Sequence, residues 1–118
     1  MNANAKNLPE FKALIERYET ITLKEIQKRW NKDNIDETHS FLTGFGRIDM
    51  CTLCVSASSY VVYGSSRCEL CVYAECFGCL RHKTYGNIRD ARTPSRLLKA
   101  FRARARYMRT ILKEIDHA

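Results

Sequence analysis

Three cysteine pairs constrain the fold of this chain more than any other feature. All six cysteines of the 118-residue sequence stand in Cys-x-x-Cys pairs, inside one 29-residue window. A two-residue gap allows one tight turn to aim both sulfurs at a single point, so each pair can supply half of a tetrahedral zinc site. The predicted metal ligands are Cys51, Cys54, Cys68, Cys71, Cys76 and Cys79, with His82 as a further ligand in Cys79-x-x-His82.

The spacing leaves several metal arrangements open. One Zn²⁺ could be held by Cys51/Cys54 and one later pair, or two Zn²⁺ could share all six sulfurs, with His82 and with Asp49 or His39 as added ligands. An iron–sulfur cluster on the last four cysteines would need four well-placed thiolates from a very short run. Disulfides are disfavoured if the compartment is reducing. We therefore expect a cofactor of one or two Zn²⁺.

The composition favours a structural rather than a catalytic metal. The pairs offer thiolates only, and the sequence contains no His-x-Glu or His-Glu-x-x-His pattern that would supply a catalytic site with a general base. We expect no enzymatic activity. The first nine residues contain no apolar stretch, and no apolar run approaches the roughly 20 residues that span a bilayer. A cytoplasmic location without a membrane partner is therefore expected.

The N-terminal part has the apolar spacing of helices. A helix is expected from Pro9 to near Glu19, because proline suits the first turn and apolar side chains recur on one face. The side chains of that face are Phe11, Leu14, Ile15 and Tyr18. Thr22 and Glu25 match a capping box, which predicts a second helix from Leu23 to about Asn31. The two helices could instead form one continuous helix.

The middle of the chain is expected to be less regular. Asp36 could cap a short helix through Leu42 that stops at Gly44. Residues 59–63 have the β-branched and aromatic content of a short strand, and the cysteine turns around them fit a zinc-knuckle hairpin. The segment from Lys83 to Arg92 is predicted to be a polar connector.

The C-terminal segment predicts one long amphipathic helix. Thr93-Pro94 is a strong helix start, and nothing breaks the pattern until about Asp116, which gives a helix about 34 Å long. Its apolar residues cluster in one arc, which we expect to pack on the N-terminal helices. They are Leu97, Leu98, Phe101, Ala105, Met108, Ile111, Leu112 and Ile115.

Positive charge is concentrated in this same segment. Residues 1–80 carry 9 Lys/Arg against 10 Asp/Glu, whereas residues 81–118 carry 11 against 3. A local basic excess points to a polyanionic partner, and arginine suits phosphate. Arg104 alone falls inside the apolar arc, so we interpret it as structural, either exposed at its tip or paired with Glu16 or Glu19. The predicted nucleic-acid contacts are Arg89, Arg92, Arg96, Lys99, Arg102, Arg106, Arg109 and Lys113.

These patterns together predict a single, mainly α domain over residues 1–118. N-terminal helices (1–48) would pack on the basic amphipathic helix (93–117), stapled by a Cys-rich zinc module (49–82). Such a chain is long enough for one modest hydrophobic core.

Two short motifs and the final helix carry a family resemblance. Leu42-Thr43-Gly44-Phe45-Gly46, then Cys51-Thr52-Leu53-Cys54, later Cys-x-x-Cys pairs and a Thr-Pro-capped basic helix resemble small cysteine-cluster proteins of bacteriophages and mobile elements. The likeness covers most of residues 20–115. It implies no reaction, but it implies a phage-type modulator or inhibitor of a host nuclease or RNA-guided defence complex.

We therefore expect a zinc-structured binder of nucleic acid, with RNA favoured, or of a nucleoprotein complex. No small-molecule substrate is expected. One alternative is a protein–protein adaptor whose basic helix docks an acidic groove. Another is a DNA-binding transcription regulator, which is disfavoured because the final helix has no Asn or Gln to read base edges.

Overall fold

The computed structural model describes residues 7–44 and 82–116, and these residues form five α-helices and no strand. The mainly helical class is thus confirmed for this part of the chain. The predicted cysteine hairpin, including the strand at residues 59–63, lies outside the described residues. The helices are α1 (Leu8–Thr20), α2 (Leu23–Arg29), α3 (Ile35–Thr43), α6 (Lys83–Arg89) and α7 (Pro94–Asp116).

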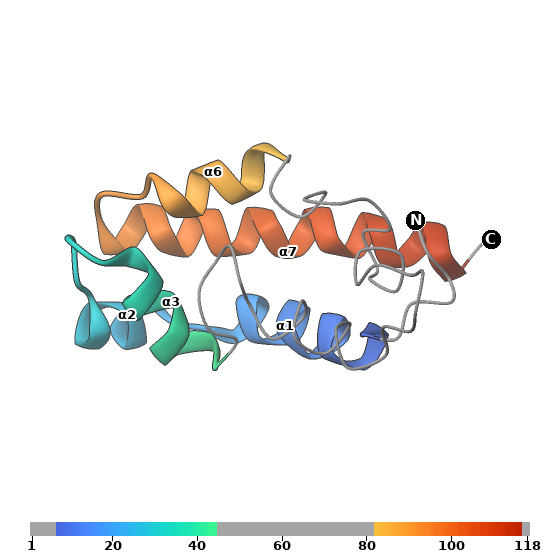
Figure 1. The fold of residues 1–118 in the computed structure, drawn as a ribbon, viewed down its shortest axis with the longest axis horizontal. Coiled ribbons are helices and arrows are strands. Elements are labelled where there is room, and N and C mark those ends of the chain that lie inside the picture. The colour runs from blue at the N-terminus through green and yellow to red at the C-terminus, as the bar shows by residue number, and fades with distance from the viewer. Residues whose placement is uncertain (1–6, 45–81, 117–118) are drawn as a thin grey trace, which may run out of the picture.

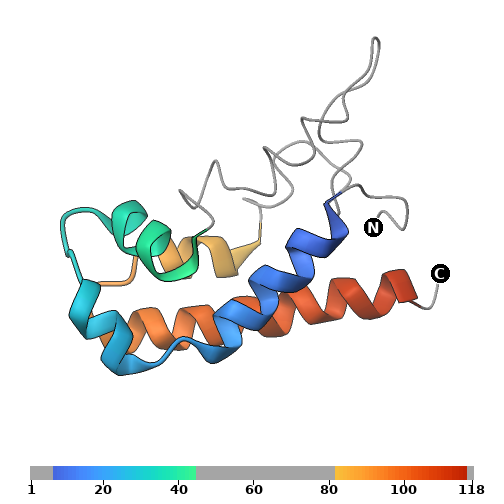
Figure 2. The ribbon, with the colours of Figure 1, turned by 90° about the horizontal axis from the view of Figure 1, so that it is seen from below.

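Helix α7 is the axis of the arrangement. Helix α1 lies along one side of α7 and runs in the opposite direction, while α6 lies along another side (Figure 1). Seen from below, α1 crosses α7 at an angle instead of lying parallel to it (Figure 2). Helices α2 and α3 gather at the end where α7 begins, and α2 contacts α7. The long helix is therefore packed against three of the other described helices.

The first two helices begin and end where local chemistry predicts. Pro9 stands in the first turn of α1, and Thr22 and Glu25 form both hydrogen bonds of the capping box that starts α2. Ile21 and Thr22 have ψ angles of 132° and 159°, which are extended rather than helical. The alternative of one continuous helix was therefore wrong.

Helix α3 confirms the predicted short helix but not its cap. The helix begins at Ile35, and the side chain of Asn34 accepts a hydrogen bond from the Glu37 backbone amide. Asp36 was therefore the wrong cap, since it already lies inside the first turn. Gly44 ends the helix with a φ angle of 74°, a left-handed conformation that glycine adopts without a steric penalty.

Helix α6 occupies most of the segment that we predicted to be a polar connector, so that prediction was wrong. The His82 ring accepts a hydrogen bond from the Thr84 amide and caps the helix. Thr84 and Ile88 stand one turn apart and are both buried. Two buried positions give too little periodicity to reveal a helix in the sequence, and contact with α7 supplies the stabilisation that its short length lacks.

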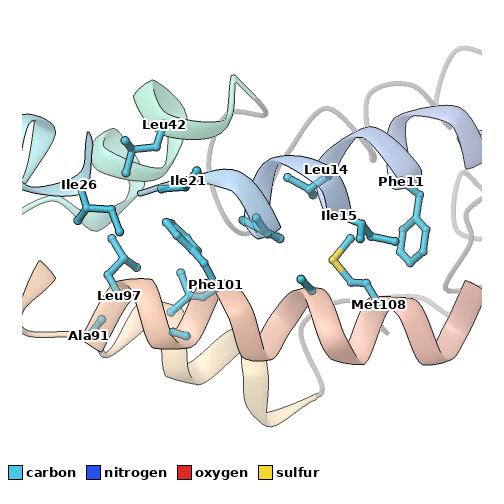
Figure 3. Close-up of a cluster of buried hydrophobic side chains, with 14 of the residues drawn as sticks. Phe11, Leu14, Ile15, Ile21, Ile26, Leu42, Ala91, Leu97, Phe101 and Met108 are labelled. Atoms are coloured by element: carbon cyan, nitrogen blue, oxygen red, sulfur yellow. The ribbon is translucent and has the colours of Figure 1, made fainter. Parts of the chain in front are cut away.

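The core forms between the two faces that the apolar spacing predicts (Figure 3). The four residues of the α1 face are buried, and so are six of the eight in the α7 arc, while Leu98 and Leu112 are partly buried. The rings of Tyr18 and Phe101 stack with centroids 5.0 Å apart, and the Tyr18 hydroxyl bonds to the buried ring of His39 at 2.7 Å. His39 is therefore part of the core.

Substitution of one buried and one exposed phenylalanine tests the position of this core. Phe101→Ala removes a side chain that is 0 % exposed and should lower the free energy of unfolding by about 3–5 kcal/mol. Phe41→Ala removes a ring that is 61 % exposed and should cost far less, within about 1 kcal/mol. Urea denaturation of both variants measures the difference. Equal losses would contradict the placement of Phe101 in the core.

Candidate nucleic-acid interface

Five basic residues of α7 form two lines along the helix, and the two lines have different roles. Lys99, Arg106 and Lys113 are spaced by seven residues, and so are Arg102 and Arg109. Because seven residues bring a helix back to nearly the same face, each series forms one line along α7. At about 100° per residue the two lines are about 60° apart. The second line faces α1, as the contacts of its two arginines show.

Arg102 is a helix cap. Its guanidinium donates hydrogen bonds to the backbone carbonyl oxygens of Tyr18, at 2.5 Å, and Ile21, at 2.6 Å. The last carbonyls of a helix have no partner within the helix, and these two lie at the end of α1 and in the link to α2. Arg102, which the sequence places among the phosphate contacts, is half-buried and binds the chain's own backbone.

Arg109 is paired with a carboxylate. Its Nε and one Nη each lie 2.6 Å from an oxygen of Glu19 on α1, a two-pronged geometry that favours strong pairing. The hydrogen bond from Arg109 lowers the pKa of the Glu19 carboxyl below its ordinary value, because it favours the ionised form. Glu19, one of the two acids that the sequence offered to Arg104 as an alternative to an exposed tip, thus pairs with Arg109.

Arg104 is buried and structural, as its position in the apolar arc indicated. Its guanidinium donates a 2.8 Å hydrogen bond to the Thr84 hydroxyl and lies 5.3 Å from the centre of the Tyr107 ring. The Thr84 hydroxyl lies 2.9 Å from Nδ1 of His82, whose ring stacks on Tyr107 at 3.5 Å. This cluster fastens the beginning of α6 to α7.

Five exposed cations remain on or beside α7, and we call them the cationic face. No side chain among the described residues forms an ion pair with any of them. Glu114 is the one exposed acid within α7 whose side chain is described. Arg89, also predicted to contact nucleic acid, instead pairs with Asp90 on the surface. The cationic face consists of Arg92, Arg96, Lys99, Arg106 and Lys113.

Of the residues named as metal ligands, His82 and the alternative ligand His39 lie within the described residues, and the six cysteines all lie outside them. Among the described residues no three potential ligands come together. Nδ1 of His82 accepts a hydrogen bond from the Thr84 amide, so in the neutral ring the proton is on Nε2. Burial, and then the charges of Arg104 and Lys83, lower the pKa of His82. A metal at Nε2 would require the other tautomer and the loss of that amide bond.

The sequence interpretation missed one surface, at the corner between α2 and α3. Phe41 is exposed there, and the Arg29 guanidinium lies 5.0 Å from the centre of its ring. The neighbouring positions 38, 39, 42 and 43 are buried, so Phe41 lies off the buried face of α3. A helical projection of α3 beside the basic run Lys28-Arg29-Trp30-Asn31-Lys32 would have indicated this surface.

No protein-family model, curated protein or solved structure matches this chain, so the function must be argued from the chain's own geometry. Within residues 7–44 and 82–116, every helix is too short or too polar to cross a lipid bilayer.

The division of the arginines predicts two different mutational effects. Arg102→Met should lower the free energy of unfolding by about 2–3 kcal/mol, because it removes two charged hydrogen bonds to partly buried carbonyls. Arg106→Met should change it by less than about 0.5 kcal/mol, because Arg106 is exposed and has no partner among the described side chains. Chemical denaturation compares them, and a larger loss for Arg106→Met would refute this assignment.

Proposed function

We propose that this protein is a non-enzymatic, zinc-structured binder of nucleic acid, with RNA favoured, or of a nucleoprotein complex. The observation that supports this most strongly is the cationic face. Its five exposed cations form no ion pair with a described side chain, since Asp90, which lies near Arg92, pairs with Arg89, and Glu19 on the neighbouring helix pairs with Arg109. Like charges on one face repel each other, and phosphates would relieve that repulsion.

The spacing on α7 suits an extended polyanion. Lys99, Arg106 and Lys113 succeed one another at about 10.5 Å and together span about 21 Å, at 1.5 Å per residue. Phosphates along one strand of a duplex are about 3.4 Å apart on the helix axis, so this length covers several of them. The cationic face offers no Asn or Gln, which favours contact with the backbone over reading of base edges.

A protein–protein adaptor is the second candidate. The same five cations would fit an acidic groove of a partner protein, including a host nuclease or RNA-guided defence complex of the kind that the phage resemblance implies. Exposed ion pairs contribute little affinity each, so such a partner would also need apolar contacts. Nucleic acid that co-purifies with the protein and is removed by RNase would separate the two candidates.

Salt dependence tests phosphate contact. With five contacts on single-stranded RNA, the logarithm of the association constant should fall against the logarithm of salt concentration with a slope of about −3.5. Arg106→Ala should make this slope shallower by about 0.7, because one contact is lost. Fluorescence anisotropy with a labelled single-stranded RNA measures both values.

Lys12→Ala is the matched control, since Lys12 is an exposed cation on α1 outside the cationic face. Its slope should equal that of the unmodified protein. Affinity that hardly changes between low and moderate salt would exclude the phosphate model.

The zinc proposal is supported by the cysteine spacing and by one feature of the fold. Helices α3 and α6 flank residues 45–81 in the chain, and these two helices contact each other. The segment with the six cysteines therefore leaves from one helix and returns to its neighbour. Metal bound by the cysteines would contribute its binding free energy to the stability of the folded state.

Elemental analysis should find one or two zinc ions per chain. Cys51→Ser together with Cys54→Ser should lower that number or abolish binding, because oxygen from serine is a poor zinc ligand. Chelation should also lower the melting temperature of the unmodified protein. If the analysis finds iron and the protein absorbs visible light, the metal centre is an iron–sulfur cluster and the zinc proposal is wrong. A folded protein without metal would refute both kinds of centre.

A further inference from the structure

Phe41 is the one large hydrophobic side chain that stands exposed among residues 7–44 and 82–116. Its ring is 61 % exposed, while its neighbours Leu42 and Thr43 are buried. Burying an exposed phenylalanine ring is favourable, so the exposed part of this ring is available for a partner. An exposed ring alone would not identify the partner, but its surroundings do.

A basic hollow of about 510 Å³ lies beside this ring, at the corner of α2 and α3. Three cations and a single acid, Glu37, line it. A second hollow of about 460 Å³ shares Phe41 and Glu37 with the first, and its lining includes a further acid, Asp36, and no cation. Phe41 therefore lines both hollows. The basic hollow is lined by Lys28, Arg29, Trp30, Asn31, Lys32, Glu37 and Phe41.

Arg29 already stacks on the ring. Its guanidinium carbon lies 5.0 Å from the ring centre, a distance at which a cation is attracted by an aromatic face. Neither Lys28 nor Lys32 forms an ion pair with a described side chain. An aromatic ring, a stacked arginine and further cations form the combination by which proteins hold unpaired bases and their phosphates.

We propose that Phe41 and the basic hollow form a stacking site for one unpaired base of single-stranded RNA. The base stacks on the exposed surface of Phe41, and the adjoining phosphates lie against Lys28, Arg29 and Lys32. This inference rests on the proposed nucleic-acid function and specifies how part of the ligand is held.

The surroundings of the ring favour RNA over a peptide. The hollow is lined mostly by charged and polar residues, whereas peptide grooves bury a contiguous apolar centre. One exposed ring is sufficient for stacking, because every base has an aromatic face.

The location of the site also agrees with the cationic face. Helices α2 and α3 lie at the end of the molecule where α7 begins, which is the end that carries Arg92 and Arg96 (Figure 1). Helix α2 contacts α7 directly. A strand held along α7 would therefore have an aromatic stacking site at the end of its path.

Substitutions at Phe41 separate stacking from simple apolar contact. Phe41→Leu keeps an apolar side chain but removes the aromatic face, and it should weaken binding of a short single-stranded RNA by about fivefold to a hundredfold. Phe41→Tyr keeps the ring and should bind within about twofold of the unmodified protein. Urea denaturation of both variants verifies that neither is unfolded.

The fluorescence of Trp30 reports independently on RNA bound in the hollow, because Trp30 lines the hollow and is the chain's single tryptophan. Its fluorescence should change when the unmodified protein is saturated with RNA. Unchanged emission at saturation would overturn the placement of the base in this hollow.

The outcomes separate this inference from the proposed function. If Phe41→Leu binds RNA normally while Arg106→Ala weakens binding, the stacking site is wrong and the cationic face stands. If the unmodified protein binds no single-stranded RNA, both are wrong. A third outcome would assign the hollow to a protein partner. In that outcome an acidic peptide binds the hollow with the same affinity in the unmodified protein and in Phe41→Leu, and the substitution leaves RNA affinity unchanged.

Discussion

Burial of two sides of α7 is the constraint on which the rest of the described structure depends. One side packs on α1 through Phe101 and Met108, and the other carries Arg104 and Tyr107 against the beginning of α6. The remaining side of α7 is exposed. Four of the five cations of the cationic face lie on that side, because the residues of the other two sides are buried against α1 and α6. The exposure of these cations therefore follows from the packing of α7 against α1 and α6.

Arginine has two different uses along this one helix. Arg102 and Arg109 border the apolar arc, and they reach the backbone carbonyls and the carboxylate of α1. Arg106 lies between them in the sequence yet about one sixth of a turn away, and it points to no described acid. A residue type that suits phosphate equally suits a helix end or a carboxylate, so identity alone does not separate these functions.

Much of the helical architecture could be predicted from local signals. Proline at the start of α1, the Thr22 capping box and the Thr93-Pro94 start of α7 each act within a few residues, so they can be read directly. Helix α6 could not be predicted, because its stability comes from α7 and not from its own spacing. Five of the eight predicted basic contacts, Arg92 and four residues of α7, are exposed and form no ion pair with a described side chain. The other three are engaged within the chain, because Arg89 pairs with Asp90 and both Arg102 and Arg109 bind α1 or the link that follows it.

The sequence by itself determined the apolar arc of α7, the helix starts and the excess of positive charge in the last third of the chain. These are properties of spacing and composition, and no distant contact is needed to express them. Only the tertiary structure decided which cations hold the fold and which face outward, because that depends on the angle at which α1 crosses α7. It also decided that Phe41 stands exposed beside Arg29, since two helices with separate patterns had to meet before either residue acquired a neighbour.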